Sequence, residues 1–159
     1  MFTKDSDRVV CAALYRGVAE PLLADVQELK FNELVWTAAD WRHMGGALAC
    51  CTKLRRLTLN QMGADDAAMA TFSGALGSGA APALEVLFLM SNKICDEGAR
   101  HLGDALARGA APALKDLGLN RNQIGDEGLR HLGDALARGA APRWRSPCLL
   151  YTSPSPRDS

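Results

Sequence analysis

Histidines and paired carboxylates are the side chains of this 159-residue sequence whose placement could support chemistry. His43, His101 and His131 fall at one position of a repeated sequence unit, which would place two of them on neighbouring helices. A zinc site needs further ligands, and no cysteine or carboxylate joins these histidines at a spacing typical of zinc. The column would instead be flanked by ion pairs at i,i+4 spacing, Arg100–Asp104 and Arg130–Asp134. We therefore expect a solvent-exposed histidine column with no metal and no cofactor.

The Asp-Glu-Gly triplets at 96–98 and 126–128 supply paired acids of the kind used in acid–base catalysis. Each triplet opens a predicted helix, where Asp126 suits the N-cap and Glu127 the positive end of the helix dipole. Capping therefore explains the acids without a substrate. The sequence shows no Ser-His-Asp or Cys-His constellation and no phosphate-binding glycine-rich loop. The expectation is a protein that is not an enzyme.

Composition narrows the class of protein further. The chain carries 18 basic and 18 acidic residues, so its net charge is zero, which argues against a nucleic-acid partner. No apolar run approaches the ~20 residues that span a bilayer, and the N-terminus lacks a signal-peptide pattern. The five cysteines are scattered and form no C-x-x-C pair, which fits reduced thiols. We expect a cytoplasmic protein without a membrane or nucleic-acid partner.

An internal repeat decides the expected fold. Leu54, Leu84 and Leu114 each open a unit, and successive units start 30 residues apart. Segments 84–112 and 114–142 are identical at 21 of 29 positions, which indicates duplication. A weaker unit with the same offsets begins at Val26. The predicted units are 26–53, 54–83, 84–113 and 114–143.

Each unit has the pattern of one strand followed by one helix. Leu117 and Leu119 alternate with polar residues, as in a strand with one buried face, whereas Leu132 and Leu136 recur at helical spacing. The Gly-Ala-Ala-Pro sequence after Arg138 ends the helix. Strands stack at ~4.8 Å, but packed helices need ~8–10 Å. The sequence therefore predicts an α/β solenoid arc, with parallel strands on the concave face and helices on the convex face.

The pattern L-x-x-L-x-L-x-x-N-x-I-G-D-E-G-x-x-x-L-x-x-A-L resembles the leucine-rich repeats of the ribonuclease-inhibitor type. Similar repeats occur in the sensor regions of NOD-like receptors and in activators of the Ran GTPase. The resemblance implies a horseshoe that binds a protein partner through its concave sheet. The function expected from it is a non-catalytic interaction scaffold. The alternative is a protein that activates or regulates a small GTPase.

Several positions depart from this pattern. Met62 and Leu34 replace the asparagine found at Asn92 and Asn122, so the asparagine-mediated turn bonding should be incomplete. Asp40 stands where later units have glycine and where the helix should approach the sheet closely. The first two units are therefore expected to be irregular.

The two ends fit the pattern poorly. Residues 1–25 are expected to be an N-terminal helical segment or a degenerate cap. Residues 144–159 are expected to be a disordered tail, and its part from Cys148 to Asp158 resembles a translated sequencing adapter. The alternative is a natural tail rich in serine and proline. On the adapter interpretation the chain is a fragment of a larger protein, and its uncapped last repeat would favour self-association.

The partner-binding surface is expected on the concave face, centred on the third unit. In register, Val86, Phe88 and Met90 would give this unit apolar side chains at all three outward strand positions, with nothing in the fold to cover them. An apolar centre with a polar rim is the usual arrangement of a binding hot spot. The alternative is that these are isolated exposed apolar residues. The remaining expected contacts on this face are Arg56, Asn60, Asp116, Asn120 and Arg121.

Overall fold

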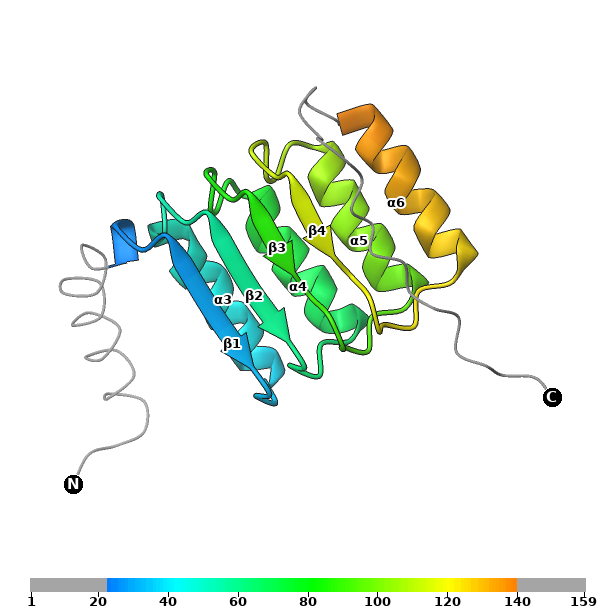
Figure 1. The fold of residues 1–159 in the computed structure, drawn as a ribbon, viewed down its shortest axis with the longest axis horizontal. Coiled ribbons are helices and arrows are strands. Elements are labelled where there is room, and N and C mark those ends of the chain that lie inside the picture. Colours follow the sequence, from blue (N-terminus) through cyan, green and yellow to red (C-terminus); the bar gives the residue numbers. More distant parts are fainter. Residues whose placement is uncertain (1–22, 140–159) are drawn as a thin grey trace.

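The computed structural model describes residues 23–139 of the chain. It contains four strands and four helices in strict alternation (Figure 1). The strands are β1 (Glu28–Asn32), β2 (Arg56–Asn60), β3 (Val86–Phe88) and β4 (Asp116–Gly118). The helices are α3 (Ala38–Cys50), α4 (Asp66–Gly77), α5 (Asp96–Ala107) and α6 (Asp126–Gly139). The prediction of four strand-and-helix units is confirmed.

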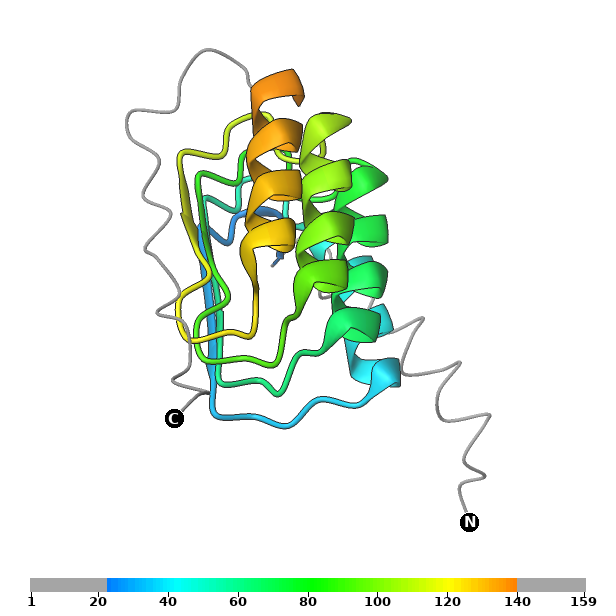
Figure 2. The same cartoon turned by 90° about the vertical axis from the view of Figure 1, so that its right-hand side faces the viewer.

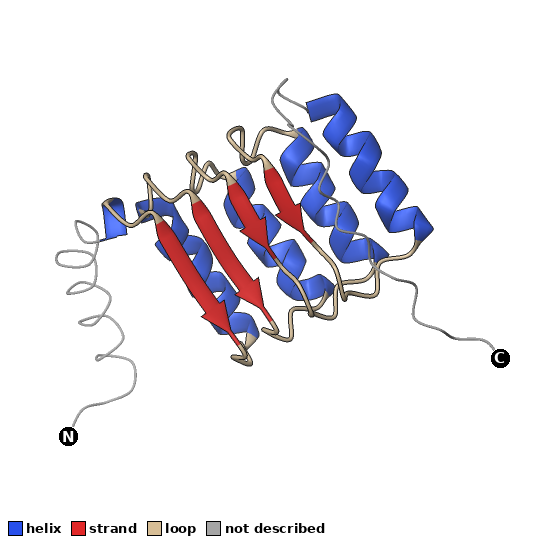
Figure 3. Ribbon diagram, viewed as in Figure 1, coloured by secondary structure: helices blue, strands red, loops and turns tan. Residues whose placement is uncertain are grey.

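The four strands form one parallel sheet in the order β1-β2-β3-β4. Figures 2 and 3 show all four helices on one face of this sheet, which leaves the opposite face without a helical layer. Every connection crosses from a strand to a helix and back to the adjacent strand, as parallel pairing requires. The result is the predicted α/β leucine-rich-repeat arc.

The core lies between the sheet and the helices. Leucines at equal positions of successive units line it, and Leu57, Leu87 and Leu117 are paired across β2, β3 and β4. All three are at most 2% exposed. At the N-terminal end, an edge-to-face series of rings runs from Trp36 through Trp41 to Phe72. At the equivalent positions the last two units have smaller apolar side chains, which are Ile94 and Ile124, Ala99 and Leu129, and Leu102 and Leu132.

Asparagine side chains tie neighbouring units together. Asn92 of the third unit accepts hydrogen bonds from the Met62 and Ala64 amides of the second unit, at 2.8 and 3.1 Å. Its amide nitrogen donates to the Leu59 carbonyl at 2.8 Å. Because each asparagine bonds to the turn of the preceding unit, Met62 leaves the first unit, not the second, without an asparagine at this position, and Met62 itself is fully buried. The second unit keeps its turn bonds from Asn92, so the irregularity falls on the first unit.

The helix starts are capped in two different ways, which corrects the prediction for the Asp-Glu-Gly triplets. In α5 the N-cap residue is Cys95, which makes no side-chain capping bond, and Asp96 is the first helical residue. The cap comes instead from the preceding helix: Asp66 accepts from the amides of Cys95 and Gly98, at 2.8 and 2.9 Å. Asp96 likewise accepts from the Gly125 amide at 2.6 Å, just ahead of α6. Each aspartate therefore caps the following helix.

The first two described helices cap themselves. Thr37 and Asp40 form a reciprocal capping box at α3, and the Asp65 side chain accepts from the Ala68 amide at α4. The position equivalent to Asp66 is Ala38 in the first unit, which has no carboxylate to offer to α4. A polar N-cap residue is thus present where the preceding helix supplies no aspartate.

The glycines of the triplets are required by these aspartates. A Cβ at Gly128 would lie 2.5 Å from the Asp96 carboxylate and 2.8 Å from the Asp96 Cα. A Cβ at Gly98 would lie 2.5 Å from the Asp66 carboxylate. The expected reason for these glycines was close approach of the helix to the sheet; the close contacts are with the preceding helix and, at 2.8 Å, with Ile94 or Ile124 in the loop that leads from the unit's own strand.

Candidate functional site

The sheet face opposite the helices carries the residues predicted to bind a partner. At the start of the strands, Arg56, Val86 and Asp116 are paired side by side on β2, β3 and β4. Arg56 and Asp116 are exposed, and Val86 between them is half-buried. Neither charged side chain has an ion-pair partner among residues 23–139. This row presents a positive and a negative group on either side of an apolar side chain.

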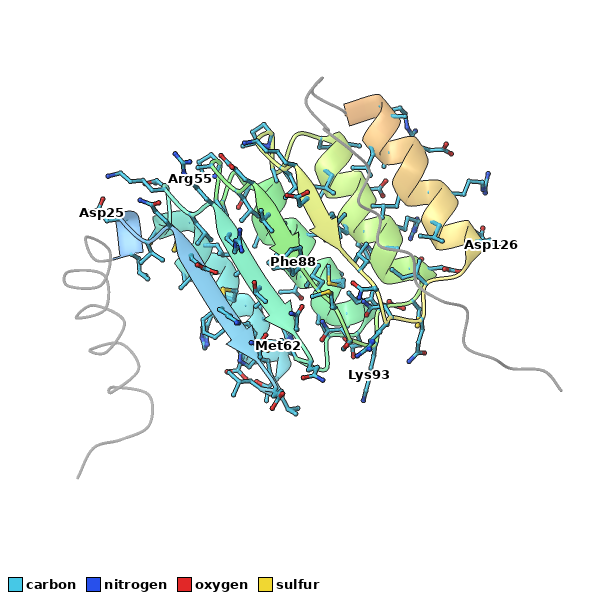
Figure 4. All side chains as sticks on the ribbon, viewed as in Figure 1. Asp25, Arg55, Met62, Phe88, Lys93 and Asp126 are labelled. Atoms are coloured by element: carbon cyan, nitrogen blue, oxygen red, sulfur yellow. The ribbon has the colours of Figure 1, made fainter. Side chains whose placement is uncertain are left out.

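The middle row is more closed than the sequence suggests. Thr58, Phe88 and Gly118 are in register, as predicted, but Thr58 is buried and Phe88 is only partly exposed. The phenyl ring lies against Gly118 of the next strand: a Cβ at residue 118 would be only 2.7 Å from the Phe88 Cδ1. Figure 4 shows Phe88 over the middle of the sheet. Because residue 118 is glycine, the ring can pack against the backbone of β4. This packing leaves Phe88 only partly exposed and corrects the expectation that nothing in the fold covers it.

A polar groove lies at the carboxyl ends of the strands. Its volume is about 460 Å³, and four predicted contact residues line it: Asn60, Met90, Asn120 and Arg121. The other lining residues lie in the second half of β1 or just after β1, β2 and β3, and are Lys30, Asn32, Glu33, Gln61 and Ser91. The predicted contacts therefore divide into this groove and the Arg56–Val86–Asp116 row, with Phe88 between them.

The rim of the groove is built by one turn geometry, repeated four times. Glu33, Gln61, Ser91 and Arg121 all have positive φ, between 55° and 59°. In three of them the amide donates to the next unit, as in Gln61 to the Met90 carbonyl and Ser91 to the Asn120 carbonyl, both at 3.0 Å. The left-handed conformation turns each amide toward the neighbouring strand. Because none of these residues is glycine, their residue types do not predict a left-handed turn.

The groove contains one unsatisfied acceptor. The Asn60 carbonyl oxygen accepts from the Met90 amide at 2.9 Å. The equivalent oxygen of Asn120 is buried and has no hydrogen-bond partner among residues 23–139. The position equivalent to the Met90 amide, 30 residues after Asn120, is residue 150, which lies outside the described residues.

A ladder of charges at the other end of the sheet was not predicted. Glu85 lies between Lys115, at 2.9 Å, and Arg55, at 3.8 Å, which occupy equal positions in the units on either side. The hydrogen bond from Lys115 holds the pKa of Glu85 below its usual range, and the charges of Lys115 and Arg55 add to the effect. The sequence feature that could have predicted this ladder is the spacing of 30 residues between Arg55, Glu85 and Lys115.

The histidine column lies on the helical face. His43 is exposed, and His101 and His131 are half-exposed. Glu97 contacts Arg100 and lies 3.5 Å from His101, so the predicted Arg100–Asp104 pair is replaced by an i,i+3 pair. Among residues 23–139, no group of three histidine, cysteine or carboxylate side chains could hold a metal ion.

The most exposed large apolar side chains are not those predicted. Val35 is 89% exposed and Leu34 is 46% exposed, both in the loop between β1 and α3. Leu34 stands where the third and fourth units have asparagine, and Met62 of the second unit leaves this first turn without the asparagine bonds that the later turns receive. In the described part of the chain, no helix is long and apolar enough to cross a membrane.

Comparison with known proteins agrees with this architecture. The family model described as "Leucine Rich repeat" matches residues 112–133. By sequence, no curated protein matches the chain. Among solved structures, the chain is similar to "Leiomodin-1 Actin-Binding Site 2 (ABS2)", with a TM-score of 0.61 and 19% identity, over 75% of this chain and 68% of that chain.

It is also similar to the tropomodulin C-terminal domain of Caenorhabditis elegans, with a TM-score of 0.55 and 13% identity, over 77% of this chain and 92% of that chain. At these identities the likeness concerns the fold. Together with the strand order and the repeat, it shows that the chain has the fold of a leucine-rich-repeat arc.

Proposed function

We propose that this chain is a non-catalytic scaffold that binds a protein partner on the sheet face opposite its helices. The observation that carries the proposal is the Arg56–Val86–Asp116 row, whose two charges have no ion-pair partner in the described part of the chain. Unpaired charges beside an apolar side chain suit a partner with complementary charges. Phe88 and the adjoining groove extend this surface across the sheet.

The shape and polarity of the groove favour a protein partner over a small molecule. The groove is open and polar, whereas sites for small molecules are mostly apolar and enclose their ligand. A partner that spans the row, the Phe88 ring and the groove would combine an apolar centre with a polar rim. We further propose a cytoplasmic location, in keeping with the scattered cysteines.

The test is a comparison of partner capture by matched variants. Arg56→Glu reverses an exposed charge on the sheet face, and His43→Asp introduces a charge at an exposed position on the helical face. Phe88→Asp removes the ring at the centre of the surface. We expect the two sheet-face variants to lose the captured protein and His43→Asp to retain it, with circular dichroism showing equal folding.

Purified actin is the first defined ligand to include, because the similar leiomodin structure is named as an actin-binding site. Binding of actin that is lost in Arg56→Glu would identify the partner class. Equal capture of any partner by the wild type and by both sheet-face variants would rule out this surface. No contact among residues 23–139 favours the GTPase-regulating alternative over simple binding, and we propose only the binding function.

A further inference from the structure

The groove at the carboxyl ends of the strands carries more positive than negative charge. Among the described residues that line it, Lys30 and Arg121 are basic, and Glu33 alone is acidic. Lys30 lies on β1 and Arg121 follows β4, so the two cations stand at opposite ends of the groove (Figure 1). Both residues are exposed, and neither forms an ion pair within residues 23–139. The two cations are therefore available to anionic groups of a ligand.

Side-chain amides lie between these cations. Asn32 and Asn60 are paired in register on β1 and β2, and both line the groove. The Asn60 oxygen accepts from the Met90 amide, but the NH2 groups of Asn32 and Asn60 donate to no acceptor within the described part of the chain. A side-chain amide can donate to a peptide carbonyl. The groove therefore offers hydrogen-bond donors to the backbone of a bound chain.

One apolar side chain interrupts this polar lining. Met90 follows β3 and is partly exposed. A Cβ at Gly118 would lie 3.5 Å from the Met90 Cγ and 2.7 Å from the Phe88 Cδ1, so both side chains pack beside the same glycine. The flexible thioether of methionine adapts to ligand side chains of different shape. Met90 thus joins the groove to the Phe88 ring at the centre of the sheet face.

The spacing of these groups matches an extended peptide that crosses the strands. Neighbouring strands lie ~4.8 Å apart, so three spacings separate β1 from β4 by about 14 Å. In an extended chain with a rise of ~3.4 Å per residue, the side chains of residues i and i+4 share one face and also lie about 14 Å apart. Residue i+2 lies midway on the same face. The long side chains of Lys30 and Arg121 allow for their different positions along the strands.

We propose that the groove binds an acidic linear peptide of the partner protein, with acidic side chains at i and i+4 and an apolar side chain at i+2. The two carboxylates pair with Lys30 and Arg121, and the apolar side chain lies against Met90. The amides of Asn32 and Asn60 donate to the peptide backbone. This inference rests on the proposed binding function and names the chemistry of the partner.

Titration of defined peptides into the isotope-labelled full-length chain tests the proposal by NMR, which measures even millimolar binding. The probe is Gly-Ser-Glu-Thr-Leu-Thr-Glu-Ser-Gly, blocked at both ends, and the matched peptide has lysine in place of both glutamates. We expect the acidic peptide to bind about tenfold more tightly, because the lysine peptide replaces two attractions by two repulsions. It should shift the amides of Gln61 and Ser91 in the groove and leave Gly46 of α3 unchanged. Equal binding of the two peptides, or no shift with either, would overturn the proposal.

Charge variants test the register of the peptide. Arg121→Glu should prefer a peptide with one glutamate and one lysine, because one end of the groove has changed sign, and Lys30→Glu should do the same. Glu33→Gln removes the acidic lining residue and should tighten binding of the acidic peptide by about twofold. Arg130→Glu, at an exposed position of α6, is the matched control and should bind as the wild type does. Unchanged peptide preference in Arg121→Glu would contradict the proposal.

The peptide class and the binding function can fail separately. If no peptide binds while protein capture still depends on Arg56 and Phe88, the acidic peptide is the wrong partner chemistry and the binding function stands. If the captured protein is lost equally from Arg121→Glu and Arg130→Glu, its binding does not use the groove, and the proposal is again overturned. Loss of capture from Arg121→Glu alone, with competition by the acidic peptide, is the result we expect.

Discussion

Removal of the Asp66 carboxylate should destabilise a helix to which Asp66 does not belong. Asp66→Ala takes away both acceptor bonds at the start of α5, to the amides of Cys95 and Gly98, and Cys95 offers no local cap. Loss of an N-cap costs about 0.5–2 kcal/mol. Because one carboxylate serves two amides here, we expect a loss of about 2 kcal/mol in the free energy of unfolding.

A second substitution should restore part of this loss. Cys95→Ser gives α5 a local N-cap oxygen that can accept a hydrogen bond, as the Thr37 hydroxyl does for α3 and the Asp65 carboxylate for α4. In the wild-type background the Gly98 amide already bonds to Asp66, so the new hydroxyl should change stability little. In the Asp66→Ala background it should recover about 1 kcal/mol. The double-mutant cycle should therefore show a coupling of about 1 kcal/mol.

The assay is urea unfolding followed by circular dichroism at 222 nm, with linear extrapolation to water. The matched control is Asp126→Ala, which removes the same residue of the last described repeat. No helix follows α6 within residues 23–139, so only the interaction with the dipole of α6 is lost, about 0.5 kcal/mol. Equal losses for Asp66→Ala and Asp126→Ala, or an equal effect of Cys95→Ser in both backgrounds, would refute capping between repeats.

Three further predictions concern packing, pH and association. Gly128→Ala should destabilise the protein by about 1–3 kcal/mol in the same urea assay, because the added Cβ would overlap the Asp96 backbone. The pKa of Glu85 is lowered in the folded state, so its stabilising effect is present above the ordinary glutamate pKa of ~4.3 and is lost as the pH falls through the folded value. The melting temperature should therefore fall less between pH 5 and pH 3 in Glu85→Gln than in the wild type, and an equal fall would contradict this. Self-association through the outer face of α6, where Leu136 is half-buried, remains a prediction that a concentration-independent monomer in sedimentation velocity would exclude.

The architecture could be predicted from the sequence because each unit repeats the same pattern of one strand and one helix. Alternating leucines, helical spacing and a 30-residue period predicted the four strand-and-helix units and the register of Arg56, Val86 and Asp116. These features depend on backbone periodicity, which neighbouring units reinforce. The repeat likewise placed the predicted contacts on one sheet face.

Contacts between units were harder to predict. An aspartate at a helix start can cap its own helix or the next one, and local spacing does not distinguish the two for Asp96. The informative signal lay in comparing units: Cys95 and Gly125 lack a capping side chain where the preceding helix has an aspartate. Coverage of Phe88 was missed for a different reason. It depends on a side-chain rotamer and on the space above Gly118, neither of which follows from a strand pattern.

Site-specific photo-cross-linking tests the binding proposal most directly. A benzoyl-phenylalanine introduced at position 88 would lie at the centre of the sheet face, and the same group at position 43 would lie on the helical face. In cell extract, we expect a defined protein adduct from position 88, suppressed by Arg56→Glu, and no matching adduct from position 43. Adducts formed equally from both positions, or from position 43 alone, would contradict binding on the sheet face.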